Sequence, residues 1–177
     1  MINVSRFITM GNAEPVEHSA LPVLPFDQLR SDVVQAVADG LRLGALLARA
    51  ESDHSARIYA VLLDDLTGLI HAASAAIPHG SFPSLTPDCP QAHLFEREIA
   101  EQLGIEPLGH PWLKPVRFHG AYSGRPQPWA GPDGAPPLIG VTNYFRVEGD
   151  EVHEVAVGPV HAGIIEPGHF RFQCHGA

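Results

Sequence analysis

The chain has 177 residues, of which 45% are hydrophobic and 18% charged, and this composition suits one domain with a buried core plus an appendage. Twenty acidic residues stand against eleven basic ones, and the net charge of −9 argues against binding to nucleic acid or anionic lipid. The two cysteines, Cys89 and Cys174, are far apart in sequence, form no disulfide framework and suit a reducing cytosol. No stretch approaches the roughly 18 apolar residues of a membrane span, and the N-terminus lacks the pattern of a secretory signal.

In the first 25 residues only 4–10 have strand character, and we expect a loosely ordered arm or an edge strand there. A helix is predicted from Phe26, with Asp27 capping its free amides and Gly40 ending it in the left-handed conformation. Its apolar face is formed by Phe26, Leu29, Val33, Val34 and Val37.

A sheet is expected to follow this first helix. Residues 42–50 form its first predicted strand, and 57–63 and 69–77 are two short apolar runs joined by acidic and glycine turn residues at 64–68. This pattern is typical of an antiparallel hairpin. Five proline and glycine positions make 78–90 irregular and exclude a continuous helix there.

The stretch from Pro90 to Pro111 is predicted to form one amphipathic helix, a glycine stop at Gly104 and a turn that ends in His110-Pro111. Its apolar positions recur at helical spacing and are Ala92, Phe95, Ile99 and Leu103, with Leu94 beside them. The other face carries Glu96, Arg97, Glu98, Glu101 and Gln102. We therefore expect one face to be buried on the sheet and the opposite face to be solvated or to meet a partner.

Beyond this helix, residues 116–122 are predicted to be extended, and the proline and glycine tract at 124–137 to be a surface excursion. Strand patterns return at 141–147, 152–157 and 170–173, and the last two are expected to pair as a hairpin. The predicted parts of the chain are an arm at 1–25, a domain at 26–123, an excursion at 124–140 and a terminal strand region at 141–177.

Two groups of residues could carry chemistry. Glu98 and Glu101 are three residues apart on one helical face and could form a catalytic carboxylate pair, but such pairs are common on helices, and a solvated or interface face is the favoured explanation. Cys89 and His93 at the start of the helix, and four residues in the tail, could bind a soft metal, but no CxxC, HxH or HExxH spacing occurs. The tail residues are His161, His169, Cys174 and His175. Neither GxGxxG nor a Walker lysine is present for phosphate binding.

The run from Glu96 to Ile105, followed by Gly109-His110-Pro111, closely resembles the pattern of the 30 kDa subunit of respiratory complex I, which reads ERExxDxxGI and then GHPDLRR. Residues 82–86 also resemble the approach to the helix in that family, and the resemblance covers about 41–118. This sequence departs from the pattern at four positions, namely Glu101 for the family's Asp, Trp112 for its second Asp, and Lys114 and Pro115 for its two arginines.

The tail from Glu151 to Phe172 is similar to the start of the large subunit of membrane-bound [NiFe] hydrogenases of the formate hydrogenlyase subunit 5 and hydrogenase-4 types. That family is related to the 49 kDa subunit of complex I, whose loop reads GPQHPxxHG. Gly158, Pro159 and His161 match the start of this loop, and Pro167 falls near the place of its second histidine. The order of the two resemblances implies an N-terminal piece of a longer large subunit, with its metal-binding cysteine pairs further along.

Together the resemblances imply a two-layer α+β fold, with helices packed on one face of a mixed β-sheet. They imply a structural and docking module of a complex-I-like NADH:quinone oxidoreductase or a membrane-bound [NiFe] hydrogenase, on the cytoplasmic side and peripheral to the membrane through other subunits. We expect no catalytic, cofactor-binding or metal residue in this chain, and Fe–S clusters, with Ni–Fe or quinone, elsewhere in the complex.

Its expected partners are an Fe–S small subunit, other peripheral-arm subunits and the remainder of the large subunit. The expected motif and interface residues are Glu96, Arg97, Glu98, Glu101, Gly104, Ile105, His110, Pro111, Gly158, Pro159 and His161. Arg97 and Glu98 are expected to hold the His-Pro turn or to meet a partner subunit. Two alternatives stay open, a free-standing adaptor domain and a small metal-binding enzyme that uses the tail histidines.

Overall fold

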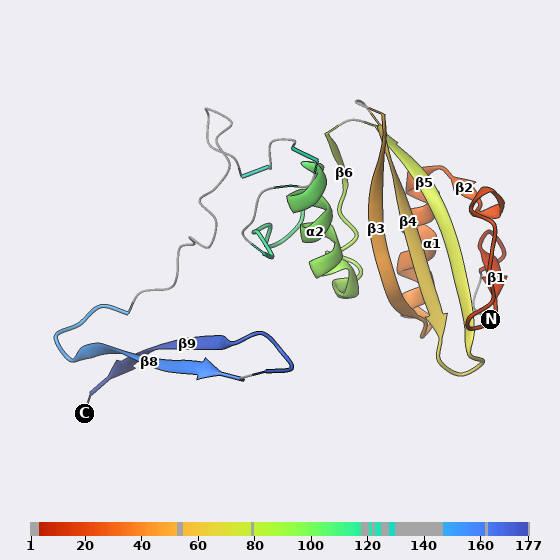
Figure 1. The fold of residues 1–177 in the computed structure, drawn as a ribbon. Helices are drawn as coiled ribbons and strands as arrows, with labels where there is room; N and C mark the ends of the chain where they lie inside the picture. The colour runs from red at the N-terminus through yellow and green to blue at the C-terminus, as the bar shows by residue number, and fades with distance from the viewer. Residues whose placement is uncertain are drawn as a thin grey trace. The chain divides into compact units, whose positions relative to one another are not determined.

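The fold was analysed in a computed structural model, which forms two compact units at 1–141 and 142–177 (Figure 1). No helix among the described residues is long and apolar enough to cross a membrane. The residues that the structure describes are 4–52, 55–78, 80–117, 121, 123–124, 128–129, 147–161 and 163–176.

A five-stranded mixed sheet forms the centre of the first unit. Its three long strands are antiparallel neighbours in the order β5, β4, β3. Two short strands from the region expected to be an arm also join it, β1 antiparallel and β2 parallel to β5. The edge-strand alternative for this region is therefore confirmed by β1, which lies within 4–10, whereas β2 was not predicted. The bounds are β1 Ile8–Met10, β2 Val23–Leu24, β3 Arg42–Ser52, β4 Ser55–Asp64 and β5 Leu69–Pro78.

The hairpin of β4 and β5 is confirmed, with every residue of β4 paired to a residue of β5. Alternate residues of β4 are buried, because a strand with one face on the core turns every second side chain inward. Gly68 closes the connecting turn at φ +72°, in the left-handed region that glycine adopts easily. The buried residues of β4 are Ala56, Ile58, Ala60 and Leu62.

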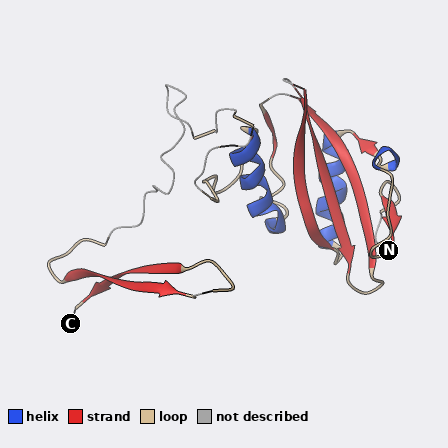
Figure 2. Cartoon of the chain, viewed as in Figure 1, coloured by secondary structure: helices blue, strands red, loops and turns tan. Residues whose placement is uncertain are grey.

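Helix α1 (Phe26–Ala38) packs against β3, β4 and β5 and buries Leu29, Val33 and Ala36 (Figures 1 and 2). The predicted cap by Asp27 is wrong, because Pro25 occupies the N-cap position and no side chain bonds the first amides. Asp27 lies inside the first turn, where its charge favours the helix dipole without a capping bond.

Helix α2 (His93–Leu103) follows a 3-10 turn at Pro90–Ala92 and packs against β3. A pair of three-residue parallel strands, β6 (Ser81–Pro83) and β7 (Glu106–Leu108), joins the chain before α2 to the chain after it. The sequence predicted neither strand. Buried residues of both helices, of β6 and of the sheet form a single core, which confirms the mixed α+β fold.

The second unit contains an antiparallel hairpin of β8 (Val152–Val160) and β9 (Gly168–His175), as predicted, with both strands longer than expected. Its pairs Val155 with Phe172 and Val157 with Phe170 lie on one face. The predicted strand at 141–147 lies, except for Val147, outside the described residues. The same is true of most of the extended segment at 116–122 and of the tract at 124–137.

Candidate functional site

The polar face of α2 is buried, and this contradicts the expectation of a solvated or partner-facing surface. Glu96 and Glu101 are 0% exposed, Arg97 is 8% exposed and Gln102 is 9% exposed. Leu94, expected beside the apolar face, is instead 57% exposed. Helical periodicity assigns charge to the outside, but two loops of the same chain cover this side of the helix. Buried charges need hydrogen-bond partners, and Glu96, Arg97 and Glu101 each have them.

Glu96 binds the loop that precedes α2. Its carboxylate accepts hydrogen bonds from Ser84 Oγ at 2.6 Å, Leu85 N at 2.6 Å, Thr86 N at 3.3 Å and Thr86 Oγ1 at 2.5 Å. Four donors on two carboxylate oxygens leave little of its hydrogen-bonding capacity unused. Ser84 and Thr86 were not predicted as site residues. They lie ten to twelve residues before Glu96, and such a separation gives no periodic signal in the sequence. Only the family resemblance of residues 82–86 pointed to this segment.

Arg97 and Glu101 bind the segment that follows the His-Pro turn. Arg97 donates from Nε to the carbonyl of Lys114 and from Nη2 to the carbonyl of Pro115, both at 2.7 Å. Glu101 accepts the backbone amides of Val116 at 2.9 Å and Arg117 at 3.0 Å. The planar guanidinium and the carboxylate thus satisfy two carbonyls and two amides of one segment. Arg97 therefore makes an ordered, charge-assisted contact within this chain, but with residues 114–115 beyond the His-Pro turn and not with the turn itself.

The pairing of Glu98 with Glu101 for acid and base chemistry finds no support in these contacts. Glu98 forms an ion pair with the side chain of Arg117, while Glu101 accepts the backbone amide of the same residue. Both carboxylates therefore hold residues 116–117 against α2. Glu101 is buried and its carboxylate oxygens are occupied by backbone amides, which gives it a structural role.

His110 and Pro111 shape the turn between β7 and this held segment. His110 lies beside His93, with ring centroids 5.2 Å apart, and Trp112 stacks on His93 at 5.9 Å. The Arg97 guanidinium lies 5.0 Å and the Lys114 ammonium 5.1 Å from the centre of the Trp112 ring. Burial, with the charge of Arg97 and then His110, lowers the pKa of His93. Trp112, which replaces an aspartate of the family pattern, therefore carries a cation–π cluster here.

Gly104 and Ile105 end the helix and return the chain to the core. Gly104 adopts φ +66° and ψ +25°, the left-handed C-cap that was predicted, and its amide bonds the carbonyl of Ala100 at 3.0 Å. Ile105 is 4% exposed and belongs to the core cluster. Both residues of the motif are therefore structural.

Gly158, Pro159 and His161 lie in or just after β8, in the other unit. The Gly158-Pro159 peptide bond is cis, and a Cβ at Gly158 would lie 2.9 Å from the carbonyl oxygen of Gly168 on β9. His161 has φ +63°. In the described part of the chain, no three His, Cys, Asp or Glu side chains gather as metal ligands would. Cys89 is buried, and this burial raises the pKa of its thiol.

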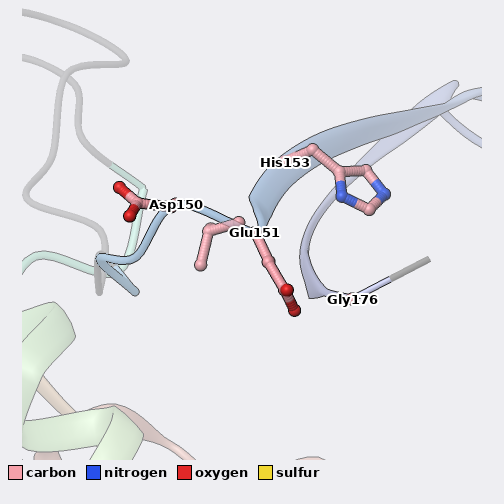
Figure 3. Close-up of a pocket in the computed structure, with 5 residues that line it drawn as sticks. Asp150, Glu151, His153 and Gly176 are labelled. Atoms are coloured by element: carbon pink, nitrogen blue, oxygen red, sulfur yellow. The ribbon is translucent and has the colours of Figure 1, made fainter.

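A depression of about 400 Å³ lies at one end of the hairpin, where Asp150, Glu151 and His153 meet Gly176 (Figure 3). All three titratable side chains are exposed and point in different directions (Figure 3). A group of exposed side chains that do not converge provides no catalytic constellation. The sequence predicted none of these as site residues, although Glu151 and His153 lie within the tail resemblance.

The sequence of this chain matches a known protein family and a known relative. Residues 30–129 match the family described as respiratory-chain NADH dehydrogenase, 30 Kd subunit, and this range contains α2 and both loops that it holds. The chain is also 30% identical over 139 residues to hydrogenase-4 component G of Escherichia coli (strain K12). That alignment covers 70% of this chain and 24% of the relative, so the chain spans about a quarter of that protein's length. The matched range exceeds half of the sequence, and the chain therefore belongs to the respiratory-chain NADH dehydrogenase 30 kDa subunit family.

Proposed function

We propose that this chain is a structural and docking module of a complex-I-like NADH dehydrogenase or membrane-bound hydrogenase, and that it carries no redox centre itself. The observation that supports this most directly is the family match over 30–129, together with the similarity to hydrogenase-4 component G. The buried contacts of α2 fit the same role, because they hold two loops in fixed positions on a rigid scaffold.

The outer face of the sheet offers a surface for docking. Leu47, Tyr59 and Val61 project from β3 and β4 on the side opposite the core and, with His18 and Leu21, line a shallow apolar depression of about 350 Å³. Leu47 is 49% exposed, and His18 bonds the Tyr59 hydroxyl at 2.9 Å at one side of the depression. Burial of an exposed leucine side chain contributes about 1.5 to 3 kcal/mol. We propose that a partner subunit of the complex covers this depression.

The finer assignment is a hydrogenase of the formate hydrogenlyase type, on the cytoplasmic side of its membrane. In this assignment the β8–β9 hairpin joins the remainder of a large subunit. Its apolar face supports the idea, since Phe170 and Phe172 are 52% and 48% exposed and stack on each other at 6.0 Å. An exposed apolar face on an isolated two-stranded ribbon favours a partner sheet.

Co-expression of this chain with an Fe–S small subunit and the remainder of a large subunit of a hydrogenase-type complex tests the proposal. The chain is expected to co-elute with them, and Leu47→Asp is expected to weaken the complex about tenfold, the equivalent of about 1.4 kcal/mol. Leu66→Asp is the matched control, because Leu66 is 97% exposed in the β4–β5 turn, outside the depression. Failure to co-elute, with a bound transition metal retained after dialysis, would instead support the small metal-binding enzyme.

A further inference from the structure

Both ring nitrogens of His110 are occupied by backbone groups. Nδ1 lies 3.1 Å from the amide nitrogen of Trp112, and Nε2 lies 3.2 Å from the carbonyl oxygen of His93. An amide N–H only donates and a carbonyl only accepts, so Nδ1 must be bare and Nε2 must carry the hydrogen. The geometry therefore selects one neutral tautomer of His110.

This histidine performs a task that Asn or Asp performs in many turns. Its side chain accepts the amide of the second residue along the chain, with Pro111 between them. Proline has no amide hydrogen, so the Trp112 amide is the first donor available after His110. The same imidazole also ties the turn to the first residue of α2 through the carbonyl of His93.

Charged and titratable side chains from α2 and from the turn surround His110. His93, the first residue of α2, has its ring centroid 5.2 Å from that of His110. Arg97 and Lys114 both lie over the ring of Trp112. The acidic side chain of the same helical turn, Glu96, accepts its hydrogen bonds from residues 84–86. Burial lowers the pKa of the neighbouring His93, with smaller contributions from Arg97 and then His110.

We propose that His110 is an acid-sensitive latch, closed when its imidazole is neutral and opened when a proton on Nδ1 displaces the Trp112 amide. Protonation converts the acceptor into a donor that faces another donor, and it adds a charge beside His93, Arg97 and Lys114. The turn at 109–112 then separates from the start of α2, and the stacking of Trp112 on His93 is lost. This inference does not depend on which complex the chain joins.

Amide NMR spectroscopy of the full chain between about pH 8 and pH 5, the range in which imidazole titrates, tests the latch. The Trp112 amide resonance is expected to shift in one step together with the ring signals of His110. His110→Asn keeps an acceptor for the Trp112 amide but does not titrate, and its Trp112 amide is expected to stay constant across this range. His175→Asn, on the exposed end of β9, is the matched control and is expected to leave the Trp112 titration unchanged.

A second variant keeps the test decisive if His110→Asn fails to fold. His93→Phe retains a stacking partner for Trp112 but removes the neighbouring titratable ring. A step in the Trp112 amide that arises from His110 is then expected to persist, because His110 keeps its bond to that amide. A Trp112 amide that does not respond to acid in the native chain, that keeps the same step in His110→Asn, or that loses its step in His93→Phe would overturn the proposal.

Discussion

The carboxylate of Glu96 accepts the backbone amide of Leu85 at 2.6 Å, and the two residues are 0% and 1% exposed. This contact joins the first turn of α2 to the loop after β6 at the centre of the core. Arg30 of α1 reaches the same loop and donates to the carbonyl of Ser84 at 3.0 Å. One loop thus connects both helices, and a charge in the core, not only apolar packing, determines its position.

Glu96→Gln is expected to destabilise the fold by about 2 to 4 kcal/mol, because the new amide group presents a donor to donors in a buried site. Urea unfolding followed by circular dichroism measures the change. Glu106→Gln serves as the control, since Glu106 is exposed on β7, and its effect is expected to stay within about 0.5 kcal/mol. Equal stabilities of the two variants would show that the four hydrogen bonds of Glu96 contribute nothing net.

The elements with a strong local pattern could be predicted from the sequence. The β4–β5 hairpin follows from two apolar runs around an acidic and glycine turn, and the left-handed end of α2 follows from Gly104. The pair β6 and β7 could not be predicted in this way. Each strand has three residues, and α2 lies between them, so no window of the sequence contains both partners.

The charged side chains of α2 show why the candidate site was only partly predicted. The helix and its polar residues were identified, but a periodic pattern treats Glu96 and Glu101 as exposed. Their burial depends on loops ten or more residues away, which provide the matching donors. Hydrogen-bond partners at such separations are set by the tertiary fold, and a single sequence contains no direct record of them.

Arg97→Lys is expected to destabilise the fold by about 1 to 3 kcal/mol, although the charge is kept. A lysine ammonium lacks the planar fork that lets Arg97 bond two successive carbonyls, those of Lys114 and Pro115. Thermal unfolding measures the loss, and limited proteolysis after Arg117 reports whether the held segment has opened. Arg49→Lys is the matched control, because Arg49 is exposed on β3, and its free energy of unfolding is expected to change by almost nothing. Equal effects at the two positions would contradict the role assigned to Arg97.

Gly104→Ala is expected to cost about 1 to 2 kcal/mol, because an L side chain at φ +66° brings Cβ close to its own backbone. Gly104→Asn is expected to cost less, since Asn visits the left-handed region more readily. Chemical denaturation of both variants measures the difference. If alanine proved as stable as asparagine, backbone strain would not explain the glycine.

The stability of the fold is expected to fall in mild acid, in part through His71. Burial lowers the pKa of His71, with Asp64 acting in the opposite direction. The unfolded chain has a histidine pKa of about 6.5, so between that value and the lower folded pKa the unfolded state binds more protons. The stabilisation is therefore complete above about pH 6.5 and is lost as the pH falls toward the folded pKa.

Replacement of His71 separates its contribution from that of other groups. His71→Gln loses the bond of Nδ1 to Thr9 Oγ1 at 2.9 Å and is expected to lower stability at about pH 8 by about 1 kcal/mol. The variant should lose less stability than the native chain between about pH 8 and pH 5.5, with a residual slope because His93 acts in the same sense. Urea unfolding at several pH values measures both quantities, and His175→Gln on exposed β9 is the control. His71 has a lowered pKa in the folded state, so its replacement must remove its share of the pH dependence of stability. If stability depends on pH as steeply in His71→Gln as in the native chain, the acid sensitivity belongs to other groups.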